Sequence, residues 1–271
     1  MGKRLCIIGL GKMGSTLVKG LVQSGTLESD KIIGTDIFVN DVEKNPDFCN
    51  ITTMNNNAKA VELSDIVLLA VKPQIINKVL EEIRTLCDGK IVISIAAGIT
   101  LGHLEKALPT SCRIIRAMPN TPVLVREGVI AICSGKNVTE EDLTIVKGIL
   151  ESVGTVFVVE EEMMDTITAL SGSGPAYVYI MIEALSDGGV LMGLPRALST
   201  ELAARTLVGA AKMVLESGKH PGELKDMVTS PGGTAIRGIE NLESHGIRGI
   251  LMDAVKEATK RARELNSQRG V

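Results

Sequence analysis

Short, almost wholly apolar runs recur along the first part of the chain, separated by stretches whose apolar residues repeat at three- and four-residue spacing. The runs fit strands that are buried on both faces, and the intervening stretches fit amphipathic helices. We predict strands at residues 5–8, 31–35, 66–71, 90–97, 112–118, 128–134 and 155–160. This alternation predicts an α/β fold with a mainly parallel, doubly wound sheet.

After residue 162 the pattern becomes helical throughout, and no run reads convincingly as a strand. Residues 165–194 form a long apolar stretch rich in Gly and Ala, and a second helix is expected from Pro195 to about Ser217. Shorter helices are expected from Pro221, Thr234 and Arg248. We therefore expect two domains, over residues 1–162 and 163–271, the second of them all-helical.

A glycine-rich turn links the first predicted strand to the first predicted helix. The sequence KRLCIIGLGKMG places Gly9, Gly11 and Gly14 in a G-x-G-x-x-G pattern directly after the strand. In this motif the first glycine allows a tight turn, the second lets the backbone approach a pyrophosphate, and the third lets helix pack on strand. The first domain is thus predicted to be a dinucleotide-binding domain of the Rossmann type.

Asp36 ends the second predicted strand, about 20 residues beyond the glycine motif, where such domains place the acid that binds a ribose diol. A carboxylate there favours a free 2′-hydroxyl and repels a 2′-phosphate. Residues 37–41 include no basic side chain. We expect NADH to be used at least as well as NADPH; the alternative is that Asp36 only caps the next turn.

The loop AVKP (70–73) follows another predicted strand, and ligands of open α/β sheets bind beyond the carboxyl ends of strands. Ala70 and Val71 are candidates to line the cofactor, Lys72 to reach its phosphates or ribose, and Pro73 to stop the strand. A solvent-exposed lysine without such a role is the alternative for Lys72.

Two further loops lie at predicted strand ends. SIAAG (94–98) offers small residues to a nicotinamide ring, and MPNTP (118–122) includes Asn120, a candidate partner for a carboxamide or a substrate. The prolines beside Asn120 also fit an ordinary rigid turn. Asn57 is a candidate contact for adenosine or a residue of a solvated loop.

The segment HPGELKDMVTSPGGTAIRGIENLE (220–243) places a Pro-Gly-Gly turn directly before an amphipathic helix. The residues Ser230, Pro231, Gly232 and Gly233 have little bulk, and the N–H groups of residues 234–236 are the unpaired donors of a starting helix. A carboxylate or phosphate fits such a site. The alternative is an ordinary helix N-cap.

Composition excludes several classes of partner. The 271-residue chain has a net charge of −3 and a pI near 5.8, which argues against nucleic acid. No signal-peptide pattern and no long apolar run is present, so no membrane partner is expected and a cytoplasmic location is predicted. The five cysteines are odd in number and widely spaced, which implies buried reduced thiols rather than a disulfide framework or a metal site: Cys6, Cys49, Cys87, Cys112 and Cys133.

Catalytic motifs that depend on histidine are missing. The three histidines form no H-E-x-x-H, there is no G-x-S-x-G, and His220 before Pro221 reads as a capping residue. A reduction that needs little acid–base help fits this inventory, and a protonated C=N bond is electrophilic enough to accept hydride once it is oriented.

The helical domain is expected to complete its core against another copy. It is rich in small residues, such as GAA at 209–211, and the whole chain has two Tyr, three Phe and no Trp. We expect a homodimer or a higher assembly.

Over essentially its full length the chain resembles pyrroline-5-carboxylate reductase. The motifs that match are GLGKMG, AVKP, SIAAG, MPNTP, SGSGPAY, ALSDGGVLMGLPR and, above all, HPGELKDMVTSPGG. The resemblance implies reduction of 1-pyrroline-5-carboxylate to L-proline by NADH or NADPH, the last step of proline biosynthesis. It also implies a helical dimerisation domain, an active site at the domain and subunit boundary, and dimers that commonly assemble into decamers.

The resemblance also assigns site residues. It implies cofactor contacts at Ile8, Gly9, Leu10, Gly11, Lys12, Met13, Gly14, Asp36, Asn57, Ala70, Val71, Lys72, Pro73, Ile95, Ala96 and Ala97. It implies substrate contacts at Ser230, Gly232, Gly233, Thr234, Ala235, Met227 and Glu161.

One position departs from the family pattern. The family usually has Thr where this chain has Ala235, and that hydroxyl is expected to hydrogen-bond the ring nitrogen of the substrate. Here Thr234 carries the hydroxyl one position earlier and is the catalytic candidate; backbone groups with water, or low turnover, are the alternatives.

Two rival functions fit parts of the sequence. A β-hydroxyacid dehydrogenase would use a lysine as its acid, but residues 165–194 include none. A non-catalytic dinucleotide sensor would need no substrate site, and only Ala235 favours it.

Overall fold

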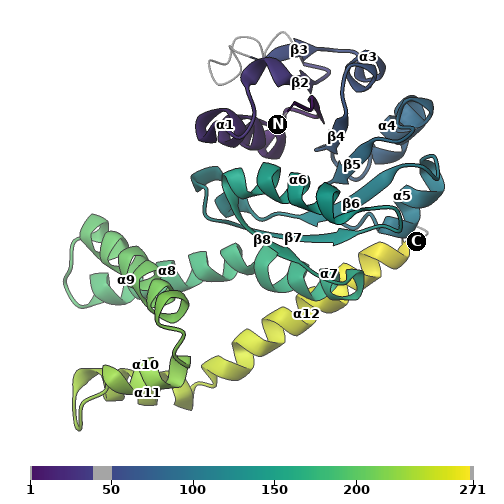
Figure 1. The fold of residues 1–271 in the computed structure, drawn as a ribbon. Helices are drawn as coiled ribbons and strands as arrows, with labels where there is room; N and C mark the ends of the chain where they lie inside the picture. The colour runs from purple at the N-terminus through teal and green to yellow at the C-terminus, as the bar shows by residue number, and fades with distance from the viewer. Residues whose placement is uncertain (1, 39–50, 269–271) are drawn as a thin grey trace. The chain divides into compact units, whose positions relative to one another are not determined.

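An eight-stranded sheet forms the centre of the first part of the chain in the computed structural model, which describes residues 2–38 and 51–268 (Figure 1). The strand order is β3-β2-β1-β4-β5-β6-β7-β8, and every neighbouring pair is parallel except β6 with β7. The strands are β1 Leu5–Ile8, β2 Ile32–Thr35, β3 Thr52–Met54, β4 Ile66–Leu69, β5 Ile91–Ser94, β6 Arg113–Met118, β7 Gly128–Ser134 and β8 Gly154–Val158. The predicted mainly parallel sheet is confirmed.

The four adjacent strands β2, β1, β4 and β5 are buried at every position, which explains why their sequences are apolar without alternation. Helices α1 and α6 pack on one face, and α3, α4 and α5 pack on the other (Figure 1). These helices are α1 Lys12–Ser24, α3 Asn57–Glu62, α4 Ile76–Ile83, α5 Leu101–Ala107 and α6 Glu140–Leu150. The sheet is therefore doubly wound, as predicted.

Strand β3 was not predicted, because its residues lie in a polar run and remain partly exposed. It pairs only with β2, through the register Gly34 to Thr53, and is an edge strand. An edge strand with limited burial lacks the apolar pattern by which the other strands were found.

Four buried cysteines lie within the described residues, and all are free: Cys6, Cys87, Cys112 and Cys133. Burial raises the pKa of the Cys6, Cys87 and Cys133 thiols to about 12 and that of Cys112 to about 11. A thiol with so high a pKa stays protonated and unreactive at neutral pH. The prediction of buried reduced thiols is confirmed for these four, and Cys49 lies outside the described residues.

The rest of the chain is helical, and residues 163–268 include no strand. The first helical stretch is α7 followed by a π-helical segment at Thr168–Gly172. The helices are α7 Met164–Ile167, α8 Gly174–Leu191, α9 Arg196–Ser217, α10 Pro221–Met227, α11 Thr234–Ser244 and α12 Ile247–Gln268. The expectation that the last helix is short was wrong, because α12 has 22 residues, as many as α9.

The pattern of contacts divides the chain into two compact units. The first comprises Met1–Gly172 and Ala258–Val271, and the second comprises Ser173–Glu257. The boundary expected at residue 162 follows the last strand, whereas the contacts also assign α7 and the end of α12 to the sheet unit. Within that unit Asn266 Nδ2 donates to Asp165 Oδ1 at 2.6 Å.

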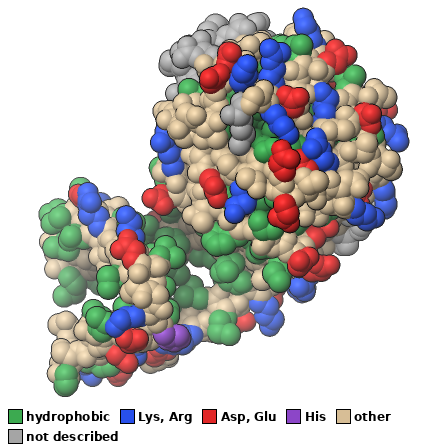
Figure 2. Space-filling view, in the orientation of Figure 1, with side chains coloured by type: hydrophobic (Ala, Val, Ile, Leu, Met, Phe, Trp, Pro, Cys, Tyr) green, Lys and Arg blue, Asp and Glu red, His purple; other side chains and the backbone are tan. Residues whose placement is uncertain are grey.

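The second unit has almost no core of its own. Of the residues in Ser173–Glu257, all of which the structure describes, only Ser186, Ser199 and Ala203 are buried. Large apolar side chains are exposed instead, among them Leu191 at 85% and Met252 at 72%, and Figure 2 shows hydrophobic side chains over these helices.

In the part of the chain that the structure describes, no helix is both long enough and apolar enough to cross a membrane.

Candidate active site

The glycine-rich turn after β1 is a tight loop that only glycine fits at two positions. Gly9 has a φ of 97°, and a Cβ there would lie 2.8 Å from the carbonyl oxygen of Ala70. A Cβ on Gly14 would overlap the Gly9 carbonyl oxygen. These two glycines let α1 start directly against the strand ends.

Gly11 differs, because no protein atom other than those of its chain neighbours lies within 4 Å of the position of its Cβ. It is the N-cap of α1, whose N–H groups at Lys12, Met13 and Gly14 have no acceptor within the helix. An open glycine beside free N–H groups at a helix N-terminus is the arrangement that a pyrophosphate requires. The residues present therefore fit a dinucleotide.

Asp36 lies just beyond β2, half-buried, and its carboxylate is fixed by the backbone. Its Oδ2 accepts a hydrogen bond from the N–H of Leu10 at 2.9 Å, and its Oδ1 accepts from the N–H of Phe38 at 3.0 Å. Each oxygen keeps a lone pair for a further donor such as a ribose hydroxyl. The carboxylate is thus hydrogen-bonded to the glycine-rich turn. Its bond to the Phe38 N–H also caps the next turn, as the alternative interpretation expects. Of the segment 37–41, only Ile37 and Phe38 are described.

The loops after β4 and β5 lie beside that turn at the same edge of the sheet. Ala70 N–H donates to the carbonyl of Ile8 at 2.8 Å, and Ile95 N–H donates to the carbonyl of Leu69 at 3.1 Å. The strands predicted at 66–71 and 90–97 extend past the observed ends of β4 and β5, because the apolar pattern continues into the loops. The structure thus brings the loops of residues 9–14, 70–73 and 95–97 together, with Asp36.

Exposure separates the candidates within these loops. Ile8 and Ala96 are buried, whereas Lys72 and Ala97 are exposed and Pro73 is half-buried. Ala96 can therefore meet a ligand only through its backbone, while Lys72 has the freedom to reach a phosphate.

The two asparagines singled out from the sequence both bond to protein groups. Asn57 is the first residue of α3, where its Oδ1 accepts from Thr35 Oγ1 at 2.7 Å and its Nδ2 donates to Glu82 Oε2 at 2.9 Å. Asn120 is buried; its Nδ2 donates to the Ser171 carbonyl and its Oδ1 accepts from Val129 N–H. The rigid-turn interpretation fits Asn120 better than a ligand contact.

In the second unit, the turn at residues 230–233 leads into α11 in the predicted way. Gly233 is the N-cap of α11 and its N–H donates to the Ser230 carbonyl at 3.0 Å, while Gly232 has a φ of 67°. A Cβ on Gly233 would overlap Ser230 Oγ. The N–H groups of residues 234–236 have no acceptor within the helix, so they are available to an anion.

The remaining substrate candidates fall in both units. Thr234 is exposed at the first position of α11, Ala235 is half-buried beside it, and Met227 is exposed at the end of α10. Glu161 belongs to the first unit, where its Oε1 accepts two hydrogen bonds from protein groups. His220 caps α10 by accepting from the N–H of Gly222 at 3.1 Å, as predicted.

Sequence reasoning missed Arg116. It lies in β6 with only 4% exposure, and its guanidinium pairs with Glu161 at 3.0 Å. The available signal was a charged residue in the middle of the apolar run RIIRAM.

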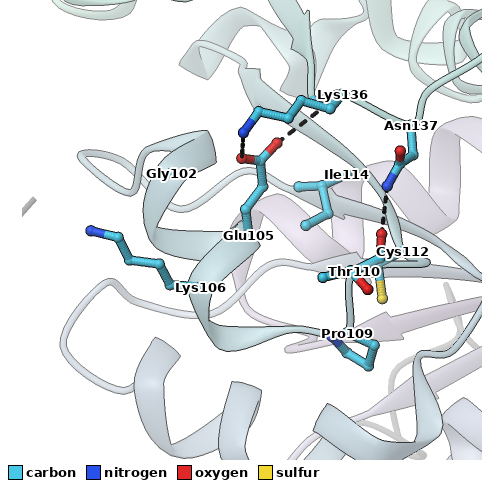
Figure 3. Close-up of a pocket in the computed structure, with 10 residues that line it drawn as sticks. Gly102, Glu105, Lys106, Pro109, Thr110, Cys112, Ile114, Lys136 and Asn137 are labelled. Atoms are coloured by element: carbon cyan, nitrogen blue, oxygen red, sulfur yellow. Dashed lines mark hydrogen bonds and ion pairs between the residues drawn. The ribbon is translucent and has the colours of Figure 1, made fainter.

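A cavity of about 470 Å³ lies at the opposite edge of the sheet, by the start of β6 and the end of α5 (Figure 3). Two of its charged side chains, Lys136 and Glu105, form an ion pair. No candidate residue lines it, so it is separate from the dinucleotide site.

Comparison with known proteins agrees with this geometry. The family model "Pyrroline-5-carboxylate reductase dimerisation" matches residues 161–265, and "NADP oxidoreductase coenzyme F420-dependent" matches residues 4–98. Pyrroline-5-carboxylate reductase of Methanosarcina acetivorans is 45% identical over 270 residues, covering 98% of this chain and 99% of the relative. The soybean (Glycine max) reductase is 46% identical over 264 residues, covering 97% and 96%.

Solved structures show the same fold. A Plasmodium falciparum pyrroline carboxylate reductase with NADP bound aligns with a TM-score of 0.88 and 36% identity, covering 98% of both chains. The Coxiella burnetii pyrroline-5-carboxylate reductase aligns with a TM-score of 0.93 and 35% identity, covering 98% and 99%. On this similarity over the full length, the chain belongs to the pyrroline-5-carboxylate reductase family.

Proposed function

We propose that this chain performs the reaction of its family mainly by orienting its two ligands, with little acid–base help from side chains. The reaction reduces 1-pyrroline-5-carboxylate to L-proline, the final step of proline biosynthesis, and the chain is an NAD(P)H-dependent oxidoreductase. The observation that carries the mechanism is the pair of open helix N-termini, one at Gly11 and one at Gly233.

The first N-terminus is proposed to hold the cofactor. The N–H groups of residues 12–14 bind the pyrophosphate, Asp36 accepts from a ribose diol, and the loops at 70–73 and 95–97 bind the nicotinamide half. The bound cofactor supplies the hydride. Ile8, Leu10 and Ala96 shape this site through the backbone, because their side chains are buried.

The second N-terminus is proposed to hold the substrate carboxylate. The N–H groups of residues 234–236 and the positive end of the α11 dipole favour an anion. Ser230 is the first residue of this turn and Met227 precedes it, and the absence of bulk at Gly232 and Gly233 permits close approach. Fixing the carboxylate orients the imine carbon for hydride transfer.

A protonated imine needs no further proton, since hydride addition at carbon gives the secondary amine of proline directly. Thr234 is proposed to hydrogen-bond the ring nitrogen, in place of the hydroxyl that Ala235 lacks.

The carboxylate site can be tested with 1-pyrroline, which has the imine and lacks the carboxylate. We expect its kcat/KM to be lower than that of 1-pyrroline-5-carboxylate by roughly a hundredfold or more, because charge-assisted hydrogen bonds are lost. Equal kcat/KM values for the two compounds would contradict the site.

We propose that NADH is used at least as well as NADPH. The support is Asp36, whose fixed carboxylate favours a free 2′-hydroxyl. The structure of the Plasmodium falciparum relative has NADP bound. The preference for NADH is therefore proposed from Asp36 of this chain and not from membership of the family.

Self-association as a homodimer is proposed from the second unit. Among residues 173–257, all of them described, Ala203 is the only buried apolar residue, so this unit cannot be stable alone and its exposed apolar faces need a second copy. The family model for dimerisation covers these helices. Further assembly into a decamer remains a prediction. A cytoplasmic location also remains a prediction, and the free thiols are consistent with it.

A further inference from the structure

A partly buried ion pair lies on the α3–α5 face of the sheet. The Arg116 side chain is 5% exposed and that of Glu161 is 31% exposed, and Arg116 donates to Glu161 Oε1 at 3.0 Å. The neighbours of Arg116 on this face, Ile114 and Met118, are apolar. A buried arginine costs free energy of desolvation, so its presence among apolar residues calls for a function that an apolar side chain could not supply.

The same carboxylate oxygen also fixes the start of α5. Glu161 Oε1 accepts from the N–H of Leu101, the first residue of that helix, at 2.7 Å. On the adjacent strand, Arg116 is paired in register with Ser94, the last residue of β5. The ion pair therefore reaches the C-terminal end of the loop at residues 95–100, and the strand that carries Arg116 borders its N-terminal end.

Buried side chains and a backbone hydrogen bond fix the interior of this loop. Ala96 and Ile99 are buried at 4% and 3%, and Ile99 N–H donates to the Ala96 carbonyl at 3.3 Å. Gly98 adopts a φ of 73° at the turn. With Leu101 bonded to Glu161 and the side chains of Ala96 and Ile99 buried, the loop is held in a position that leaves Ile95 half-buried and Ala97 exposed.

We propose that Arg116 and Glu161 are positioning residues, which hold the loop at residues 95–100 against the nicotinamide half of the cofactor. Glu161 would thus act on the loop and not on the substrate directly. The inference rests on the proposed function in one respect, the placement of the nicotinamide beside this loop. Neither residue needs to touch the cofactor.

The test compares two ligands that share all parts of the cofactor except one. ADP-ribose has the adenine, both riboses and the pyrophosphate but no nicotinamide, so its binding does not depend on this loop. Dissociation constants for NADH and ADP-ribose are measured by calorimetry on the intact protein, for wild type and Arg116→Met. Methionine removes the buried charge and fills much of its space, so we expect the variant to fold.

We expect Arg116→Met to raise the Kd for NADH by roughly tenfold and to leave the Kd for ADP-ribose unchanged. Glu161→Gln keeps an oxygen for the Leu101 N–H and should retain most of the NADH affinity, whereas Glu161→Ala should not. Arg113→Met is the matched control. Arg113 lies on the same strand as Arg116, and its loss breaks the pair with Asp142, which should lower thermal stability without changing the ratio of the two constants.

Unchanged constants in Arg116→Met, or an equal rise for both ligands, would overturn the inference. The wild-type activity separates this failure from a failure of the proposed function. Turnover of 1-pyrroline-5-carboxylate with unchanged constants in the variant rejects only the positioning role. If Arg116→Met gives the expected dissociation constants but the wild type does not turn over 1-pyrroline-5-carboxylate, the positioning role stands and the proposed function is rejected.

Discussion

Thr234 and Ala235 occupy the first two positions of α11, and the exposed hydroxyl is on Thr234. The resemblance to the family implies a hydroxyl one position later. If Thr234 bonds the ring nitrogen, then Thr234→Ala removes that bond and should lower kcat by roughly tenfold to a hundredfold. Steady-state kinetics with saturating cofactor measure this change.

The double variant Thr234→Ala with Ala235→Thr restores a hydroxyl at the family position and should recover most of kcat. Wild-type kcat in Thr234→Ala alone would show that backbone groups and water serve the ring nitrogen instead.

Residue-scale reasoning from the sequence succeeded where a residue type has one dominant use. The glycines at 9 and 14 meet the expected close contacts, and Asp36 lies beside the glycine-rich turn. For Asn120 the structure favours the rigid-turn alternative. The bonds that Asn120 and Glu161 make to protein groups could not be predicted, because which partner a polar side chain chooses depends on residues far away in the sequence. Arg116 was missed for the same reason, since its partner is 45 positions away.

At the scale of elements, the turn from β1 into α1 separates a structural glycine from a ligand-binding one. Gly14→Ala places a methyl group on the Gly9 carbonyl oxygen and should destabilise the fold by about 3 kcal/mol. Gly11→Ala meets no protein atom within 4 Å and should cost less than about 1 kcal/mol. Urea unfolding measures both values.

For ligand binding by the folded protein, we expect Gly11→Ala to have the larger effect of the two variants. The methyl group of Gly11→Ala enters the space next to the free N–H groups of α1, so the Kd for NADH should rise by roughly tenfold or more. If Gly11→Ala binds NADH as wild type does, the pyrophosphate does not lie at this N-terminus.

Elements with a strong apolar period were predictable, and those without it were not. Strands β1 and β7 have the predicted bounds, whereas the strands at 66–69 and 91–94 end before the apolar sequence does. Strand β3 lacks the pattern because it is at a partly exposed edge. The full length of α12 was missed because charged residues are frequent along its second half and many of its residues are exposed.

At the scale of the whole molecule, the exposed apolar side chains of the second unit favour self-association. Its exposed large side chains, such as Leu191, Met192 and Leu215, need a covering surface. We expect analytical ultracentrifugation to give at least twice the 28.7 kDa chain mass, and the midpoint of unfolding to rise with protein concentration. A 28.7 kDa particle whose unfolding does not depend on concentration would contradict the homodimer.

The central claim is that this chain reduces 1-pyrroline-5-carboxylate with NADH at least as well as with NADPH. The most direct test follows the absorbance of each reduced cofactor with and without the substrate. We predict rapid substrate-dependent oxidation, with kcat/KM for NADH equal to or above that for NADPH. No turnover by folded, NADH-binding protein would contradict the reductase activity, and NADPH better by about tenfold or more would contradict the role of Asp36.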